Sequence, residues 1–148
     1  MPNHCYNSVK IVCPSEEEAR TLKDFLEGED TEFDFNRLVP MPEELLEATK
    51  DPDEQADRIA RHGHHWWYEW RIANWGTKWN SYDDDLDEEE MRQGLLHYTF
   101  ATAWSPPDGI CRALLDHLAA VCPDATVNWF YEEEGDELRG QLEQEVGA

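Results

Sequence analysis

The chain has 148 residues, 40% of them apolar, and a formal net charge of −22 at pH 7. This length is that of one domain, and an aromatic load of seven Trp, five Tyr and five Phe argues against an intrinsically disordered chain. Because a field of this sign repels nucleic acid and anionic membranes, the charge argues against direct binding to either and favours basic partners.

The N-terminal part of the chain predicts a strand, a helix and a second strand. Residues 4–13 alternate between apolar and polar side chains, as a half-buried strand does. Ser15 and Glu18 form a capping box, which opens a helix that Gly28 closes. Residues 33–38 alternate again and predict the second strand. On the first strand, one face holds Val9, Ile11 and Cys13, and the other holds Tyr6, Ser8 and Lys10.

Residues 40–93 predict helices and loops instead of strands. A short helix is expected over 43–50, and a second begins at Pro52, after an aspartate that caps it, and ends at Gly63. The run 83–90 has seven acids in eight residues, and we expect it to form an exposed loop or a frayed helix.

The C-terminal part predicts a strand over 95–104, then a helix with apolar residues at helical spacing that ends near Pro123. A last strand is expected over 126–131, where apolar and polar residues alternate again. Beyond it, an acidic tail of about 132–148 is weakly patterned and is expected to fray.

Without the insertion, the order of elements is strand, helix, strand, strand, helix, strand. This βαββαβ order is that of the ferredoxin-like fold, an α+β plan in which two helices cover one face of a four-stranded antiparallel sheet. We therefore predict a single domain over residues 1–148, with a Trp-rich helical insertion at about 40–93 between the second and third strands.

Five phrases of the sequence carry a family resemblance. They are Met1–Asn7, Val39–Pro42, Asn74–Asn80, Phe100–Pro107 and Tyr131–Gly135, and together they span most of the chain. In this order they resemble the YubB-type ferredoxin-like family of plasmid- and phage-encoded accessory proteins. The resemblance implies an origin on a mobile element and the ferredoxin-like fold. It implies no catalytic residue and no cofactor.

The predicted compartment is the cytoplasm of a host bacterial cell. The first residues carry neither the basic patch nor the apolar run of a signal peptide, and no stretch approaches the roughly 20 apolar residues of a membrane span. The four cysteines lack the C-x-x-C spacing of zinc and redox motifs, so we expect buried, reduced thiols at Cys5, Cys13, Cys111 and Cys122.

The acid runs are the candidate binding surface. One interpretation is a solvated surface that only keeps the protein soluble, which the scarcity of lysine supports. The other is a mimic of the phosphate backbone, since duplex DNA carries one charge per about 1.7 Å of its axis. The predicted contact residues are Asp83, Asp84, Asp85, Asp87, Glu88, Glu89 and Glu90, and then Glu132, Glu133, Glu134, Asp136 and Glu137.

A tryptophan cluster is the second candidate, with five tryptophans in fourteen residues: Trp66, Trp67, Trp70, Trp75 and Trp79. Several are three or four residues apart, so they share one side of a helix. One interpretation is a small core that fixes the insertion to the sheet. The alternative is an aromatic surface for a protein partner, because Trp and Tyr dominate interface hot spots.

Enzymatic chemistry has weaker support. His62, His64 and His65 lie near Asp57 and Glu69, which suggests a metal site, but the spacing of H-E-x-x-H is missing. No Gly-rich elbow surrounds a serine or cysteine, and no phosphate-binding loop is present. We therefore expect no catalytic residue, no metal and no cofactor.

These observations predict a non-enzymatic accessory protein of a phage or plasmid. It is expected to bind a basic host protein or nucleoprotein complex, such as a nuclease or a CRISPR or restriction subunit, without binding nucleic acid or membrane directly. In this interpretation it is an acidic inhibitor, anti-CRISPR or anti-restriction. The alternatives are a metal-dependent enzyme that uses the region His62–His65, and a passive acidic accessory domain.

Overall fold

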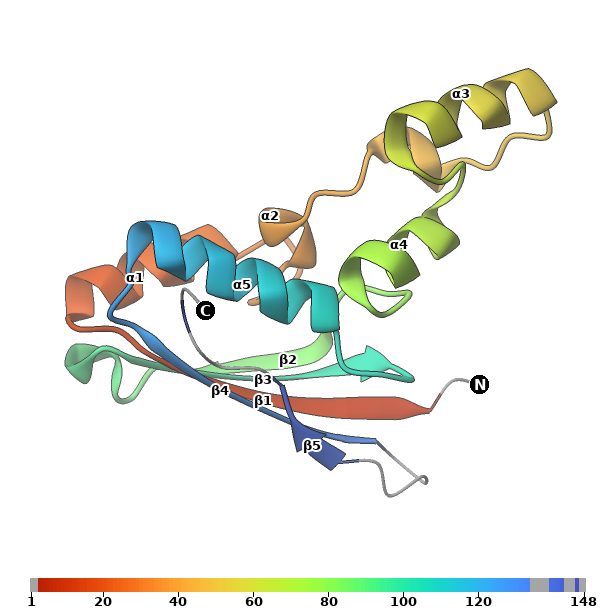
Figure 1. Cartoon of the computed structure of the whole chain (residues 1–148). Helices are drawn as coiled ribbons and strands as arrows, with labels where there is room; N and C mark the ends of the chain where they lie inside the picture. The colour runs from red at the N-terminus through yellow and green to blue at the C-terminus, as the bar shows by residue number, and fades with distance from the viewer. Residues whose placement is uncertain (1–2, 134–138, 143–145, 147–148) are drawn as a thin grey trace.

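The structure, a computed structural model, describes residues 3–133, 139–142 and 146. It is an α+β fold with a five-stranded antiparallel sheet in the order β2-β3-β1-β4-β5. The predicted class and the antiparallel sheet are therefore confirmed, but the sheet has five strands where four were expected. The helices drawn in Figure 1 all lie on one side of this sheet.

The strands are β1 (His4–Val12), β2 (Tyr82–Asp87), β3 (Leu95–Ala103), β4 (Thr126–Glu133) and β5 (Arg139–Gln141), and the α-helices are α1 (Glu16–Leu26), α2 (Phe35–Leu38), α3 (Pro52–His62), α4 (Trp67–Trp75) and α5 (Asp108–Val121). Two short 3₁₀ turns, η1 (Glu43–Leu46) and η2 (Met91–Gln93), complete the elements that the structure describes. Among the described residues, no helix combines the length and the apolar character that crossing a membrane requires.

The core lies between the sheet and the helices. Val9 and Ile11 of β1 are fully buried, while Tyr6 and Lys10 on the opposite face are exposed, as the alternation predicted. The fully buried Trp129 of β4 makes an edge contact with Phe33, their ring centroids lying 5.9 Å apart. Large rings of this kind supply much of the area that a small domain buries.

A buried polar contact fixes the position of β1 between its two neighbours. The side-chain amide of Asn7 donates to Thr102 Oγ1 on β3 at 3.0 Å, and its oxygen accepts from Trp129 Nε1 on β4 at 3.1 Å. A shift of β1 by one residue would turn this amide to the other face and leave buried polar groups without partners.

The predicted strand over 33–38 is wrong. Phe33 and Phe35 are both fully buried, which explains the alternation, but they enter the core from a loop and a short helix. The side chain of Asp34 accepts a hydrogen bond from Asn36 N at 2.9 Å and caps α2. An N-cap of this kind starts a helix at a position that alternation alone assigns to a strand.

The second strand is instead β2, within the acid run that was predicted to be a loop or frayed helix. The carboxylates of Asp83, Asp85 and Asp87 are exposed, while Leu86 packs against the core. An edge strand in water tolerates acids on its exposed side, so packing and position override their low strand propensity. The helical segment consequently precedes β2 and does not lie between the second and third strands.

Local signals elsewhere are confirmed. Glu18 N donates to Ser15 Oγ at 3.3 Å, as the capping box requires, and α3 begins with Pro52 in its first turn. Gly63 closes α3 with a φ of +86°, a left-handed conformation that favours glycine. The four cysteines are free and buried, as expected. Burial raises the pKa of the Cys5 thiol to about 11.

The insertion is joined to the rest of the molecule where α4 meets α5. A Cβ on Gly109 of α5 would lie 2.0 Å from the carbonyl oxygen of Asn74 of α4, so only glycine allows this approach. Trp75 of α4 is fully buried and donates from Nε1 to Val39 O at 2.8 Å. The α4 end of the insertion therefore belongs to the main core.

Candidate functional site

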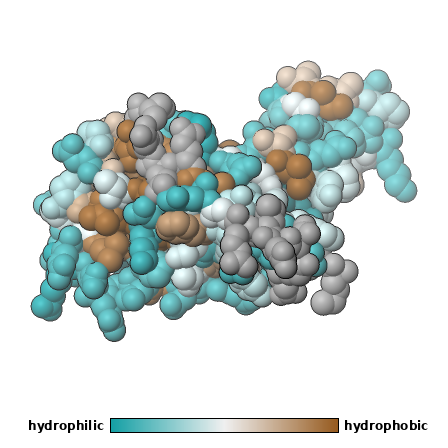
Figure 2. Space-filling model, turned by 60° about the horizontal axis from the view of Figure 1, so that its bottom comes forward, coloured by the Kyte–Doolittle hydropathy of each residue, from teal (hydrophilic) through white to brown (hydrophobic). Residues whose placement is uncertain are grey.

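The uncovered face of the sheet carries a hollow of about 760 Å³. In Figure 1 this is the side of the sheet opposite the helices, and Figure 2 turns it forward, with brown apolar residues among teal hydrophilic ones. The residues that line the hollow are Tyr6, Asn7, Ser8, Asp83, Thr99, Phe100, Ala101, Phe130, Tyr131, Glu132, Gly140 and Gln141. We refer to it as the sheet-face hollow.

Two aromatic rings give the sheet-face hollow its apolar character. Tyr6 of β1 and Phe130 of β4 are 51% and 50% exposed, although side chains of this size are usually more deeply buried. In the register of the sheet, Phe130 lies opposite Ser8, two residues along β1 from Tyr6. The two rings therefore stand on neighbouring strands on the same face.

Ser8 also contacts the next strand. Its hydroxyl lies 2.9 Å from His97 Nε2 on β3, within hydrogen-bond distance. A serine and a histidine in contact suggest nucleophilic catalysis, which also needs a third group to orient the imidazole. Among the described residues, Ser8 is the one side chain that hydrogen-bonds to the His97 ring. We therefore describe Ser8 and His97 as a polar contact between β1 and β3 on the face of the sheet. The sequence analysis predicted that Ser8 faces outward but did not pair it with His97.

The acids of the run 83–90 differ in what they contact. Asp83, Asp85, Asp87, Glu89 and Glu90 are exposed, and Asp83 also lines the sheet-face hollow. Asp85 lies opposite Thr99 and Asp87 opposite His97 in the register of β2 and β3. These five residues, which we call the β2 acid edge, place carboxylates along one border of the uncovered face.

Asp84 and Glu88 contact other elements of the chain, whereas Asp87 accepts a hydrogen bond from the nearby Glu89 N at 3.0 Å. The Asp84 side chain accepts hydrogen bonds from the backbone N–H of Glu32 at 2.6 Å and of Phe33 at 3.3 Å. Glu88 lies 3.6 Å from Lys23 Nζ of α1. Asp84 thus holds the loop before α2, and Glu88 contacts a base of this protein.

The second acid run is only partly described. Glu132 is exposed and lines the sheet-face hollow, whereas Glu133 is 8% exposed and turned to the other face. The predicted contact residues Glu134, Asp136 and Glu137 lie outside the described residues. The alternation along β4 therefore separates two acids that the sequence analysis placed in one surface.

The histidines of the insertion lie on an arm, residues 43–65, which carries η1 and α3 away from the sheet (Figure 1). His62 Nε2 contacts Glu44, while His64 lies 3.8 Å from Glu69. The described residues contain no group of three or more His, Cys, Asp and Glu side chains placed to hold a metal ion.

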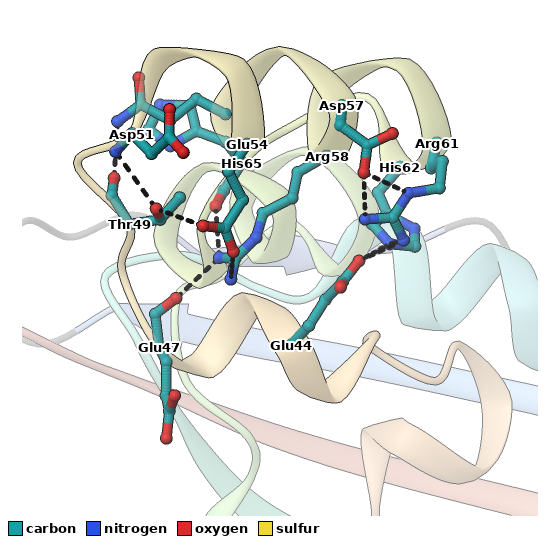
Figure 3. A network of polar contacts seen from close by, with 11 residues as sticks. Glu44, Glu47, Thr49, Asp51, Glu54, Asp57, Arg58, Arg61, His62 and His65 are labelled. Carbon is teal, nitrogen blue, oxygen red and sulfur yellow. Dashed lines mark hydrogen bonds and ion pairs between the residues drawn. The ribbon is translucent and has the colours of Figure 1, made fainter.

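Polar contacts hold the arm together, as Figure 3 shows. Arg61 pairs with Asp57 at 2.8 Å and also contacts Glu44 of η1. Hydrogen bonds from Arg61 and then from His62 lower the pKa of the Glu44 carboxyl to about 2. Arg58, the buried residue of α3, donates from one nitrogen to the carbonyl oxygens of Glu47 at 2.7 Å and His65 at 3.2 Å. The arm is therefore fixed by charge and hydrogen bonding.

Some tryptophans of the cluster fit the interpretation as a small core, and others fit the interpretation as an aromatic surface. Trp70 and Trp75 are buried in the core, so they fix the insertion to the sheet. Trp66 and Trp67 contact one another and Tyr68 near the start of α4, and are partly exposed. Trp79 is exposed, and Lys78 Nζ lies 4.6 Å from the centroid of one of its rings.

Comparison of this chain with models of protein families, with curated proteins and with solved structures found no match.

Proposed function

We propose that this protein is a non-enzymatic inhibitor that binds a basic, nucleic-acid-handling protein or complex through the β2 acid edge and the neighbouring face of the sheet. The observation that carries the proposal is the position of the acids. Five exposed carboxylates follow one edge strand and the turn after it, at the border of an uncovered sheet face.

This arrangement supports a binding surface over a merely solubilising one. Asp85 and Asp87, at alternate positions of β2, point the same way and are held in register by the ladder between β2 and β3, while Asp83 precedes them at a register shift with a φ of +50°. A basic groove that binds nucleic acid presents Lys and Arg along a line of phosphates. Carboxylates that a strand already fixes in place compete well for these Lys and Arg side chains, because they lose little conformational entropy when they bind.

The wider context of the proposal comes from the fold and from the sequence. The order of strands β2-β3-β1-β4 and the helices α1 and α5 on one face support a ferredoxin-like plan with β5 added at the edge. We also propose that the chain belongs to the YubB-type family, on the five phrases described above, with an origin on a phage or plasmid. The proposed target is a CRISPR or restriction component in the host cytoplasm.

The test is affinity capture from a bacterial lysate at about 150 mM salt, where the Debye length is about 8 Å. The protein is compared with a variant in which the β2 acid edge is neutralised, with Asp→Asn at positions 83, 85 and 87 and Glu→Gln at 89 and 90. We expect a basic partner that duplex DNA displaces, and at least a tenfold loss of its binding in the variant.

A matched control separates the surface from total charge. It removes five exposed acids elsewhere, at Glu17, Asp24, Glu43, Asp116 and Asp124. The control should retain the partner and its salt dependence. Equal loss in both variants, or no partner retained at this salt by the unmodified protein, would contradict the proposal and support a passive acidic domain.

A further inference from the structure

The sheet-face hollow lies beside the β2 acid edge, and its chemistry is different. Its floor is formed by β1, β3 and β4, where Ser8 and Thr99 supply hydroxyl groups and Tyr6 and Phe130 supply half-exposed rings. Asp83 places a carboxylate at its border. The hollow thus combines aromatic surface, hydrogen-bond acceptors and negative charge.

A guanidinium group matches this combination. It is planar, always charged and carries five N–H donors, and it stacks on aromatic rings. Hydroxyl and carboxylate oxygens accept its donors in the plane, while the rings cover its faces. A lysine ammonium satisfies the charge but offers no flat face, so it gains less from Tyr6 and Phe130.

Contacts between arginine side chains and aromatic rings already occur within this chain. The guanidinium carbon of Arg71 lies 5.2 Å from the centroid of a Trp67 ring and 4.9 Å from one of Trp75. Arg37 lies 5.3 Å from the Phe25 ring centroid. Contact between a guanidinium and an aromatic ring is thus part of how this chain folds, and the hollow offers two further rings for it.

We propose that the sheet-face hollow is an arginine-binding site, which receives an arginine side chain of the basic partner while the β2 acid edge binds the bases around it. The inference rests on the proposed function for the source of the arginine, but the site itself is a property of this chain. A nucleobase also stacks on aromatic rings, but phosphates attached to it would meet the carboxylates of Asp83, Asp85 and Asp87.

The test uses two blocked six-residue peptides, hexa-arginine and hexa-lysine, titrated into the full chain at about 150 mM salt by calorimetry. Equal charge cancels the general attraction, so the ratio of the two dissociation constants reports the preference for a guanidinium, which combines stacking with in-plane hydrogen bonds. We expect hexa-arginine to bind about two- to fivefold more tightly, the range of an exposed cation–π contact. Shifted ring signals of Tyr6 and Phe130 in the NMR spectrum locate the contact.

Two variants locate the preference in the hollow. Phe130→Leu and Tyr6→Leu keep an apolar side chain but remove the ring, and each should move the ratio toward one, chiefly by weakening the binding of hexa-arginine. Asp85→Asn should weaken both peptides equally. Val121→Ala, at an exposed apolar residue of α5, is the control and should change neither. Circular dichroism of each variant verifies the fold.

The outcomes distinguish this inference from the proposed function. A ratio of one in the unmodified protein, or a preference that survives both ring variants, overturns the arginine site even if a basic partner is captured. A ring-dependent preference supports the site even if no partner is retained. Binding of a single-stranded oligothymidylate that requires Tyr6 or Phe130 would also overturn it, in favour of a nucleobase site.

Discussion

The carboxylate of Asp84 accepts a 2.6 Å hydrogen bond from the backbone N–H of Glu32, so the second residue of the acid run holds the loop that leads into α2. The same carboxylate accepts from Phe33 N and from the hydroxyl of Thr31. These bonds satisfy backbone donors at a place where Phe33 enters the core. Its neighbours Asp83 and Asp85 are exposed, so adjacent acids serve different purposes.

Asp84→Ala is therefore expected to lower the free energy of unfolding by about 1–3 kcal/mol, because it leaves several part-buried donors without this partner. Asp85→Asn should change it by no more than about 0.5 kcal/mol, as exposed substitutions usually do. Urea denaturation of both variants measures the difference. Equal stabilities would show that the Asp84 contacts contribute nothing.

Tyr98→Phe is expected to stabilise the protein by about 1 kcal/mol. Tyr98 is fully buried, and its hydroxyl has no hydrogen-bond partner among the described residues. The variant removes an unsatisfied polar group and keeps the ring, which packs edge-on against Phe33. The control Tyr82→Phe removes a hydroxyl that contacts His4 and Thr102, and it should not stabilise. A lower melting temperature for Tyr98→Phe would contradict this prediction.

Gly109→Ala is expected to cost about 1–3 kcal/mol, because the new methyl group would overlap the Asn74 carbonyl and push α4 from α5. Gly63→Ala offers the contrast. No atom lies within 4 Å of a Cβ there, and the cost is only that of a positive φ at the end of α3. Thermal unfolding should detect the loss of stability in Gly109→Ala. Hydrogen exchange of the arm should detect the local effect of Gly63→Ala.

Alkaline pH is expected to destabilise the protein through its buried thiols. Burial, and next the hydrogen bond to Glu18, raise the pKa of the Cys122 thiol to about 12. The unfolded chain loses this proton near the ordinary thiol pKa of 9.0 and the folded chain near 12, so stability falls between these values as pH rises. Urea midpoints across this range measure the slope.

Cys122→Ser should reduce the slope, because a serine hydroxyl donates to Glu18 without titrating in this range. It should not abolish it, since burial also raises the pKa of Cys5 and Tyr98. A slope that the variant leaves unchanged would assign the alkaline effect to other groups.

Arg58→Met is expected to loosen the arm and leave the sheet intact. The guanidinium joins α3 to the carbonyl groups of Glu47 and His65, and it also bonds to Glu54 one turn earlier in the same helix. Without it those carbonyl groups lose charged donors. Limited proteolysis should show faster cleavage within residues 43–65, with an unchanged global melting temperature. Arg61→Met, at an exposed arginine, is the matched control and should accelerate cleavage less.

Much of the fold could be predicted from local signals. Three elements are specified by residues that are near neighbours in sequence. The signals are the alternation along 4–13, the capping box at Ser15 and the glycine at 63. The second strand could not be found this way. Phe33 and Phe35 alternate because both enter one core, while β2 is a strand because β3 pairs with it.

The candidate site, too, could be predicted in part from local signals and depends in part on distant pairing. Alternation predicted that Tyr6 and Ser8 face away from the core, and charge predicted an acidic surface near β2. The hollow depends on placing β4 beside β1, which brings Phe130 next to Ser8. That pairing joins residues more than a hundred positions apart, and short-range periodicity carries no information about it.

The double hydrogen bond of Arg58 has a consequence for the engineering of this chain. Since a single nitrogen contacts both Glu47 O and His65 O, these two carbonyl groups of the arm lie close together in space. The residues between them form a closed loop of the chain that contains α3 and no strand of the sheet. A short Gly-Ser bridge in place of this loop would give a truncated scaffold, and the vacated position would serve as a graft site for another helical hairpin.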